Sequence, residues 1–176
     1  MLTCLEDCPA ENHSCQLALF LYKTVSHNTK KMTEEQKEKY IEDLDDELLR
    51  GGVNLSEWTI FQAKDAEIAF CSGAYLSSIL SGQAAIESHL RFDHFNENDL
   101  KRLSFFDLIN KSCLSEKLKE ELHELRKFRN KWIHVNDPDE DHDLLSRPKY
   151  YENKLAEFAK VTMKNMLRTL YFNPMI

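Results

Sequence analysis

An arginine, an asparagine and a histidine lie close together in one charged segment of the chain. Residues 124–143 read ELRKFRNKWIHVNDPDEDHD, so that Arg129 and Asn130 are followed by His134. Arginine carries a permanent charge on a planar fork that suits a phosphate, and histidine exchanges a proton near neutral pH. In RNA the 2′-hydroxyl supplies an internal nucleophile. The residue types therefore suit metal-independent RNA cleavage, with His134 as general acid or base and Arg129 as phosphate clamp.

The helix that must position Arg129 is predicted to start at Ser115, and its apolar stripe includes the arginine. The other members of the stripe are Leu118, Leu122, Leu125 and Trp132. Burying an unpaired guanidinium is costly, so Arg129 either reaches solvent along its own stem or is held for an anion. Five positions on an ideal helix separate Arg129 from His134 by about 140°. We expect either the helix to end near Trp132 or a second copy to complete the site across a two-fold axis.

The rest of the chain also has the pattern of helices. Its 176 residues are 42% hydrophobic and include only four glycines and four prolines, too few turn signals for a sheet protein. We predict an all-α helical bundle with one long central helix and additional N-terminal helices. The expected helices are a short one over 14–27, one opened by the Thr33–Gln36 capping box, the central one over 56–92, one over 104–111 that starts at Ser104 with Asp107 three residues on, and one over 149–171.

The predicted central helix has residues three, four and seven positions apart along one seam. The apolar ones are Phe61, Ile68, Tyr75, Ile79, Ile86 and Leu90, and Ser72 and Gly82 are small residues in the same seam. Small residues there allow a neighbouring helix to approach closely, and a glycine at 73 or 82 equally marks a bend or a break. We divide the chain into a helical extension over 1–55, packed on the main domain, and a helical bundle over 56–176.

Charge is distributed unevenly along the chain. The net charge of −7 argues against a protein that coats nucleic acid indiscriminately. Residues 34–50 carry eight acids and three bases, whereas 111–131 carry seven bases and four acids, and 147–168 carry six bases and two acids. If the last two segments pack together, they create a local basic face in an acidic protein.

Cysteine and the acidic residues give weaker signals. Cys4, Cys8, His13 and Cys15 have the types of zinc ligands, but no CxxC pair is present, and we favour reduced thiols over a metal site. The loop DPDEDHD over 137–143 lacks the glycine and final glutamate of a calcium loop. With no apolar run of eighteen residues and no basic leader, we expect a cytoplasmic protein that uses no membrane, metal or cofactor.

The segment LRKFRNKWIHV resembles the RxxxxH signature of the HEPN superfamily, and Asn130 matches the frequent RNxxxH form. SGAYLSSILSGQAAIESHLRF, over 72–92, is similar to the long second helix of that family. The resemblance covers roughly 56–172. It implies an all-α bundle, usually a homodimer, whose paired motifs line a cleft that cuts RNA without metal in active members.

Many proteins with this signature are toxins or anti-phage effectors, so the resemblance also implies an antitoxin or another neutralising partner. Carried over by position, Arg129 and His134 would be catalytic and Asn130 would orient the phosphate. Glu87, Lys131 and Arg126 would contact the substrate. Two alternatives remain open at this stage. In the first, the chain is a non-catalytic module for helical dimerisation or for binding a nucleotide or RNA. In the second, Arg129 and His134 have only a structural role.

Overall fold

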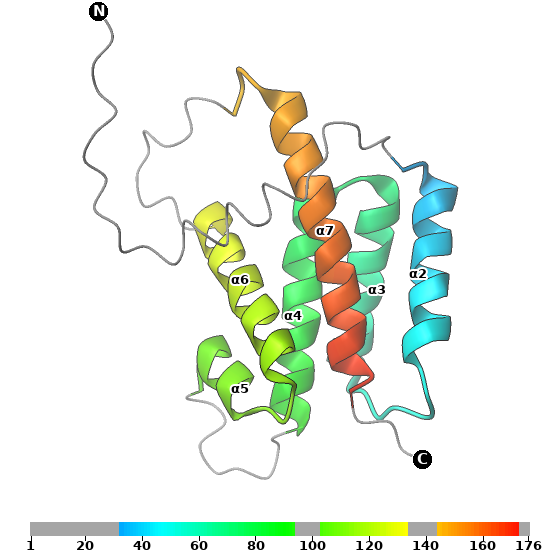
Figure 1. Ribbon diagram of the computed structural model, residues 1–176, viewed down its shortest axis with the longest axis vertical. Helices are drawn as coiled ribbons and strands as arrows, with labels where there is room; N and C mark the ends of the chain where they lie inside the picture. The colour runs from blue at the N-terminus through cyan, green and yellow to red at the C-terminus, as the bar shows by residue number, and fades with distance from the viewer. Residues whose placement is uncertain (1–31, 94–102, 134–143, 173–176) are drawn as a thin grey trace, which may run out of the picture. The chain divides into compact units, whose positions relative to one another are not determined.

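The computed structural model describes residues 32–93, 103–133 and 144–172. Helices are the only extended elements that these residues form (Figure 1), which confirms the predicted all-α class. In chain order the helices are α2 (Glu34–Leu48), α3 (Glu57–Ser72), α4 (Tyr75–Asp93), α5 (Phe105–Lys111), α6 (Glu116–Ile133) and α7 (Pro148–Leu170). All of them belong to one compact unit that begins at Met32. The helix expected over 14–27 lies outside the described residues.

Two helices start at capping boxes that the sequence predicts. At the start of α2, the Gln36 backbone N–H donates to Thr33 Oγ1 and the Thr33 N–H donates to Gln36 Oε1, at 3.3 and 3.0 Å. Ser104 and Asp107 make the same reciprocal pair at the start of α5. Each box satisfies N–H groups that have no partner within the helix, so local sequence alone fixes these boundaries.

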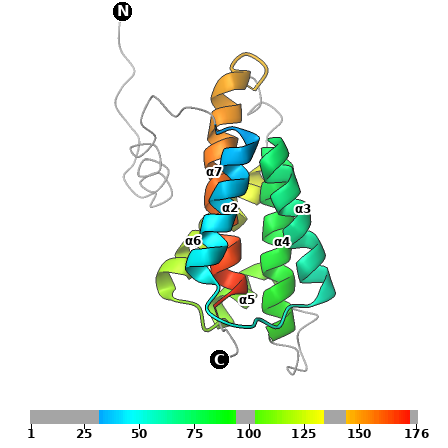
Figure 2. The ribbon, with the colours of Figure 1, turned by 90° about the vertical axis from the view of Figure 1, so that its right-hand side faces the viewer.

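The segment predicted as the central helix is helical but divides at Gly73, one of the two glycines where a bend or break is expected, because the chain reverses between α3 and α4. Gly73 ends α3 with φ +84°, a left-handed conformation that a residue with a Cβ adopts only under strain. The Ala74 N–H then donates to the Ala69 carbonyl at 2.8 Å and closes the end of the helix. Figure 2 shows α3 and α4 side by side as a helical hairpin.

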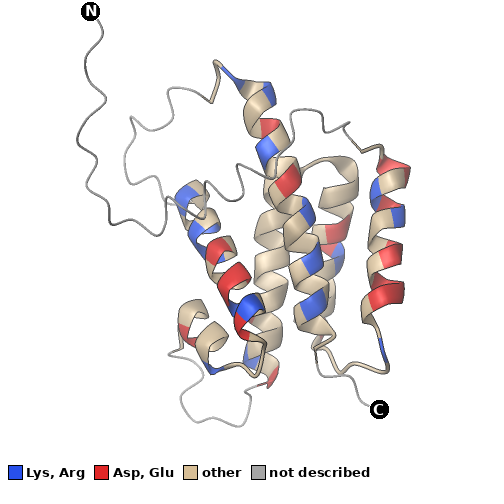
Figure 3. Cartoon of the chain, in the orientation of Figure 1, with Lys and Arg blue, Asp and Glu red and all other residues tan. Residues whose placement is uncertain are grey.

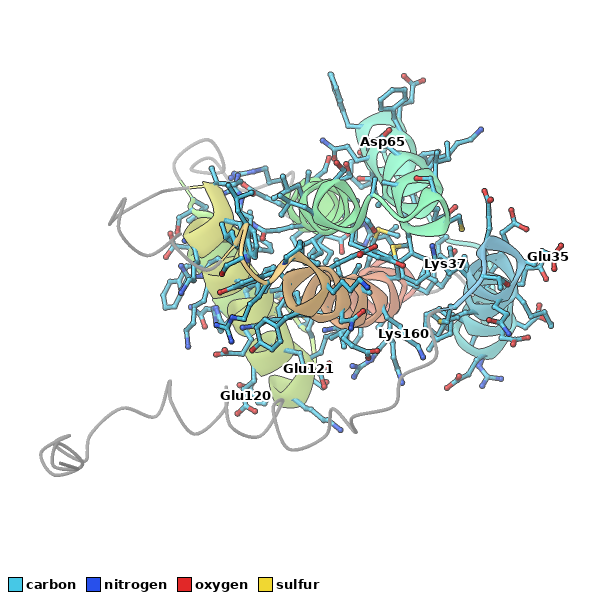
Figure 4. The ribbon with its side chains drawn as sticks, turned by 90° about the horizontal axis from the view of Figure 1, so that it is seen from above. Glu35, Lys37, Asp65, Glu120, Glu121 and Lys160 are labelled. Atoms are coloured by element: carbon cyan, nitrogen blue, oxygen red, sulfur yellow. The ribbon has the colours of Figure 1, made fainter. Side chains whose placement is uncertain are left out.

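A buried lysine of α2 reinforces this end of α3. Lys37 is 5% exposed, and its Nζ donates to the Cys71 carbonyl at 2.9 Å. The ammonium lies 5.9 and 5.0 Å from the ring centroids of Phe70 and Tyr75. A cation at the C-terminus of a helix is favourable because the free carbonyls there carry partial negative charge. Figure 4 shows Lys37 directed from α2 toward the bundle, whereas Glu35 points to solvent.

Gly82 sets how closely α4 approaches α7. A Cβ at this position would lie 2.9 Å from Thr162 Cγ2. The Thr162 hydroxyl donates to the Phe158 carbonyl at 2.8 Å, which holds its methyl group in place. Buried residues of both helices surround the contact, among them Ile79, Ile86, Met163 and Met166. Gly82 does not break the helix; it allows close packing.

The apolar repeat over 56–92 divides between two different surfaces. Tyr75, Ile79, Ile86 and Leu90 of α4 are buried, as the spacing predicts. Phe61 and Ile68 are 70% and 60% exposed, so their predicted place in the same packed seam is wrong. The reason is that α3 turns its other side, with Thr59, Ala63, Ala66 and Phe70, toward the bundle.

We predict that Gly82→Val lowers the free energy of unfolding by about 1–3 kcal/mol, because the added methyl groups collide with the fixed Thr162 side chain. Urea titration followed by circular dichroism measures this change. Gly52→Val is the matched control, since no atom lies within 4 Å of a Cβ there. Equal stability of the Gly82 variant and the control would contradict close packing at Gly82.

Candidate functional site

Arg129 lies on α6, one turn beyond three buried leucines. Leu118, Leu122 and Leu125 form the buried stripe of the helix, as predicted, whereas Arg129 is half-buried. Arg129 makes no hydrogen bond or ion pair with any other residue in the described part of the chain. None of its nitrogen atoms is both buried and without a partner, so the guanidinium reaches solvent. Arg129 thus combines an apolar stem contact with a cationic group open to an anion.

Aromatic side chains hold this end of α6 on the first half of α7. The rings of Phe128 and Phe158 stack with centroids 3.7 Å apart and planes 13° apart. Trp132 lies 5.9 Å from Phe128 and 6.4 Å from Tyr151, between centroids. Phe158 covers one face of the Phe128 ring within the chain. Packing between α6 and α7, rather than stacking on a base, therefore explains the position of Phe128. Trp132 is half-buried, less than its predicted place in the buried stripe implies.

The two basic segments of the sequence pack together, as the predicted local basic face requires. Besides the aromatic contacts, Arg168 Nη1 of α7 donates to Glu121 Oε2 of α6 at 2.6 Å. Figure 3 shows Lys and Arg at the C-terminal end of α6 and along α7, whereas Asp and Glu follow α2. Asn130 is half-buried and Lys131 is exposed, and on α6 they lie about 100° and 200° around the helix axis from Arg129. Basic side chains therefore outnumber acidic ones at the C-terminal end of α6 and on α7, and acidic side chains outnumber basic ones on α2 (Figure 3).

The first turn of α7 lies next in sequence to this end of α6 across residues 134–143. Arg147 is the N-cap residue of α7 and makes no side-chain capping hydrogen bond, and its guanidinium lies 5.2 Å from the Tyr150 ring centroid. An uncapped helix N-terminus carries partial positive charge. Arg147 is one of the six bases of 147–168, and the sequence predicts no particular role for it. The Arg147–Pro148 pair at the helix start was the available signal.

His134 lies outside the described residues, as do the acids over 137–143 and the cluster Cys4, Cys8, His13 and Cys15. The structure describes α6 through Ile133. The side of the helix on which His134 lies relative to Arg129 therefore stays a prediction.

Arg126, an expected substrate contact, is engaged on another side of α6. Its guanidinium carbon lies 5.3 Å from the ring centroid of Phe106 in α5, and its Nε is buried without a partner. Phe106 also packs on His123, with centroids 4.9 Å apart. Burial and then the charge of Arg126 hold the pKa of His123 below its usual value. Arg126 thus belongs to the contact between α5 and α6.

Glu87, the other expected contact, is paired on its own helix. Arg91 Nη2 donates to Glu87 Oε1 at 2.6 Å and to the Leu103 carbonyl at 3.0 Å. Glu87 lies about 9 Å from the C-terminal end of α4, and Arg129 lies about 20 Å from the N-terminal end of α6. Both of those helix ends lie at the bottom of Figure 1, so the two side chains are at different levels of the bundle.

Comparisons with protein-family models, with curated proteins and with solved structures find no match to this chain. Within the described residues, no group of three or more His, Cys, Asp or Glu side chains is placed to hold a metal ion. Over the same residues, no helix combines the length and the apolar character that crossing a membrane requires. Of the expected site residues, the structure leaves Arg129 open to an anion, with Asn130 next to it in sequence and His134 outside the described residues.

We predict that Arg126→Ala raises the pKa of His123, because the change removes a neighbouring positive charge and exposes the imidazole to water. A proton NMR titration of the His123 ring measures the shift. Arg129→Ala, three residues further along the same helix, is the control and leaves this pKa unchanged. An equal shift in both variants would show that Arg126 is not specifically directed at α5.

Proposed function

We propose that the chain is a metal-independent endoribonuclease of the HEPN type, acting as a toxin or anti-phage effector in the cytoplasm. The observation that carries the proposal is Arg129, a half-buried arginine without a described partner, five residues before His134. An arginine that only stabilised the fold would be expected to pair with a nearby carboxylate, as Arg168 pairs with Glu121 and Arg91 with Glu87. A guanidinium left open in this way suits a phosphate.

In the proposed reaction His134 accepts the proton of the RNA 2′-hydroxyl, and the oxygen attacks the adjacent phosphorus. The bond from phosphorus to the 5′-oxygen breaks, which leaves a 2′,3′-cyclic phosphate, and the departing 5′-oxygen takes up a proton to become a hydroxyl. Arg129 donates to the phosphate oxygens, on which negative charge grows in the transition state. Asn130, the next residue, is proposed to orient the phosphate, whereas Lys131 lies about 200° around α6 from Arg129 and contributes positive charge nearby rather than a contact to the same phosphate.

The charge distribution supports an RNA substrate at this end of the bundle. A protein with net charge −7 repels nucleic acid over much of its surface, so binding requires a local basic face. Figure 3 shows such clustering at the end of α6 and on α7. Phosphate contacts of this kind weaken as salt rises, because counterions are released on binding.

A second copy is part of the proposal, although the leucine stripe of α6 does not require one. Leu118, Leu122 and Leu125 are covered by the same chain, so no dimer is needed to bury them. Two observations remain. The spacing of Arg129 and His134 separates them by about 140° on an ideal helix. Ile133, Leu145 and Tyr150, which flank residues 134–143, are 41%, 94% and 43% exposed and provide apolar surface for a partner.

We predict that Arg129→Ala and His134→Ala each reduce cleavage of single-stranded RNA in EDTA by about 100-fold or more, as losses of a phosphate clamp or an acid–base group do. Gel analysis of end-labelled RNA measures the rates. Lys127→Ala is the matched control, because Lys127 is exposed and pairs with Glu124 on the same helix. His142→Ala controls for the loss of a histidine outside the motif.

Undiminished cleavage by either motif variant would reject the mechanism. Wild-type protein that binds RNA without cutting it would instead favour the binding module considered above. Arg129→Lys separates charge from geometry, since lysine keeps the charge and loses the planar fork.

We also predict that mixing the two inactive variants restores about a quarter of wild-type activity, if each site takes Arg129 from one copy and His134 from the other. Half of the re-formed dimers are then mixed, and each mixed dimer has one intact site. Cleavage is measured after the mixture is incubated to exchange subunits. Activity that stays at the level of the separate variants would place both residues of a site in one chain.

A further inference from the structure

The outer face of α3 is apolar and exposed. Trp58, Phe61 and Ile68 are 71%, 70% and 60% exposed, and they lie on one side of the helix because they are three and seven residues apart. Ile60, 52% exposed, lies at the edge of the same surface. We call these four residues the α3 outer face.

This face is larger than chance exposure explains. Single exposed apolar side chains are common, but here two aromatic and two branched side chains are adjacent on a regular helix. Together they present roughly 400–500 Å², close to the largest patches that monomers show, and such patches are often functional. The opposite side of α3 is already packed through Ala63, Ala66 and Phe70. Thus α3 is apolar on two sides, and only one of them is covered by the described residues.

Charge indicates the kind of partner that fits. Glu57 and Asp65 are exposed on the same side of α3, against one exposed lysine, Lys64. Asp65 is held in place, since Ser81 Oγ of α4 donates to Asp65 Oδ2 at 2.9 Å. Next to α3 lies α2, whose exposed side is strongly acidic (Figure 3). A second copy would bring acidic surface against acidic surface, whereas a basic partner would be complementary.

We propose that the α3 outer face binds an amphipathic helix of another protein, with an apolar stripe flanked by lysine or arginine. The stripe would cover Trp58, Phe61 and Ile68, and the basic flanks would face Glu57, Asp65 and α2. Helices commonly bind in this way through apolar residues three, four and seven positions apart. Tryptophan and other aromatic residues are the usual centres of binding energy.

This surface is separate from the candidate RNA site. Viewed from above in Figure 4, α3 with Asp65 and α6 with Glu120 and Glu121 lie on different sides of α4 and α7. Helices α3 and α6 do not form a packed pair. The docking proposal therefore stands or fails independently of RNA cleavage.

The test uses two synthetic 18-residue amphipathic helical peptides with the same leucine stripe. The remaining positions are lysine in one peptide and glutamate in the other. Binding to the full chain is measured by fluorescence anisotropy of labelled peptide. We expect the lysine peptide to bind at least 10-fold more tightly than the glutamate peptide. Phe61→Ser and Ile68→Ser should each weaken its binding at least 10-fold. Val161→Ser on α7, also an exposed apolar position, should change it less than 2-fold.

Trp58 provides a second readout. In a Trp132→Phe background it is the only tryptophan of the chain, and its emission should shift to shorter wavelength when the lysine peptide covers it. Circular dichroism confirms that each variant is folded, which is expected because the substituted side chains are exposed.

Three results would overturn the proposal. The first is equal affinity for the two peptides, and the second is binding that the Phe61 and Ile68 variants retain. The third is a wild-type dimer, seen by sedimentation, that Phe61→Ser dissociates, because the face would then be an interface between copies of this chain. Stronger binding of the face to phospholipid vesicles than to the lysine peptide would count against it in the same way.

Discussion

The close contact between α4 and α7 at Gly82 is the constraint on which the other helices depend. Because Gly82 has no side chain, the Thr162 methyl group and the α4 backbone come within a distance that a Cβ would not allow. Ala66 of α3 and Met166 of α7 meet at the same point, so three helices share one small residue. With α4 and α7 fixed, α6 has a surface on which to bury Leu122 and Leu125, and Arg129 follows on the same helix at the edge of the packed region. A loss of contact at Gly82 would therefore reach the candidate site through α7 and the Phe128–Phe158 stack.

Much of the helical layout could be predicted from the sequence, because its determinants are local. The capping residues Thr33 and Ser104 specify helix starts through hydrogen bonds within four residues, and both predictions are confirmed. Local sequence does not determine the end of α3 in this way, since a glycine in an apolar repeat is compatible with a bend, a break or close packing. Gly73 and Gly82 turn out to have different roles. Gly73 ends α3 because contacts to the Ala69 and Cys71 carbonyls stabilise the helix end there. The Cys71 carbonyl is bound by Lys37, which belongs to α2. Periodicity alone does not contain such a long-range contact.

For the candidate site, too, spacing predicts some features and tertiary contacts decide the others. That Arg129 lies beside a leucine stripe follows from spacing, and the structure agrees. What spacing does not give is the partner of each charged residue. Glu87 pairs with Arg91, four residues along its own helix, which sequence does suggest as an alternative. Arg126 lies over Phe106 of a different helix, and only tertiary packing determines that contact. For the same reason periodicity does not identify which apolar side of α3 is buried. Phe61 and Ile68 are seven residues apart, whereas Ala63, Ala66 and Phe70 are three and four apart, and only the second set is covered.

The two proposed surfaces differ in the sign of the charge around them. The acidic side chains of α2 lie beside α3, and basic side chains outnumber acidic ones at the C-terminal end of α6 and on α7 (Figure 3). Two contacts join α2 to α7: the Lys160 ammonium of α7 lies 4.8 Å from the Tyr40 ring centroid of α2, and the Tyr171 hydroxyl at the end of α7 donates to Asp45 Oδ1 of α2 at 2.8 Å. Burial and the Asp45 carboxylate raise the pKa of Tyr171, so this hydroxyl remains a donor at neutral pH. An acidic chain can in this way present a basic end to a phosphate and an acidic, apolar side to a basic helix. Because the α3 outer face and the end of α6 that carries Arg129 are made of different residues, an RNA and a basic partner can bind the same molecule without competing.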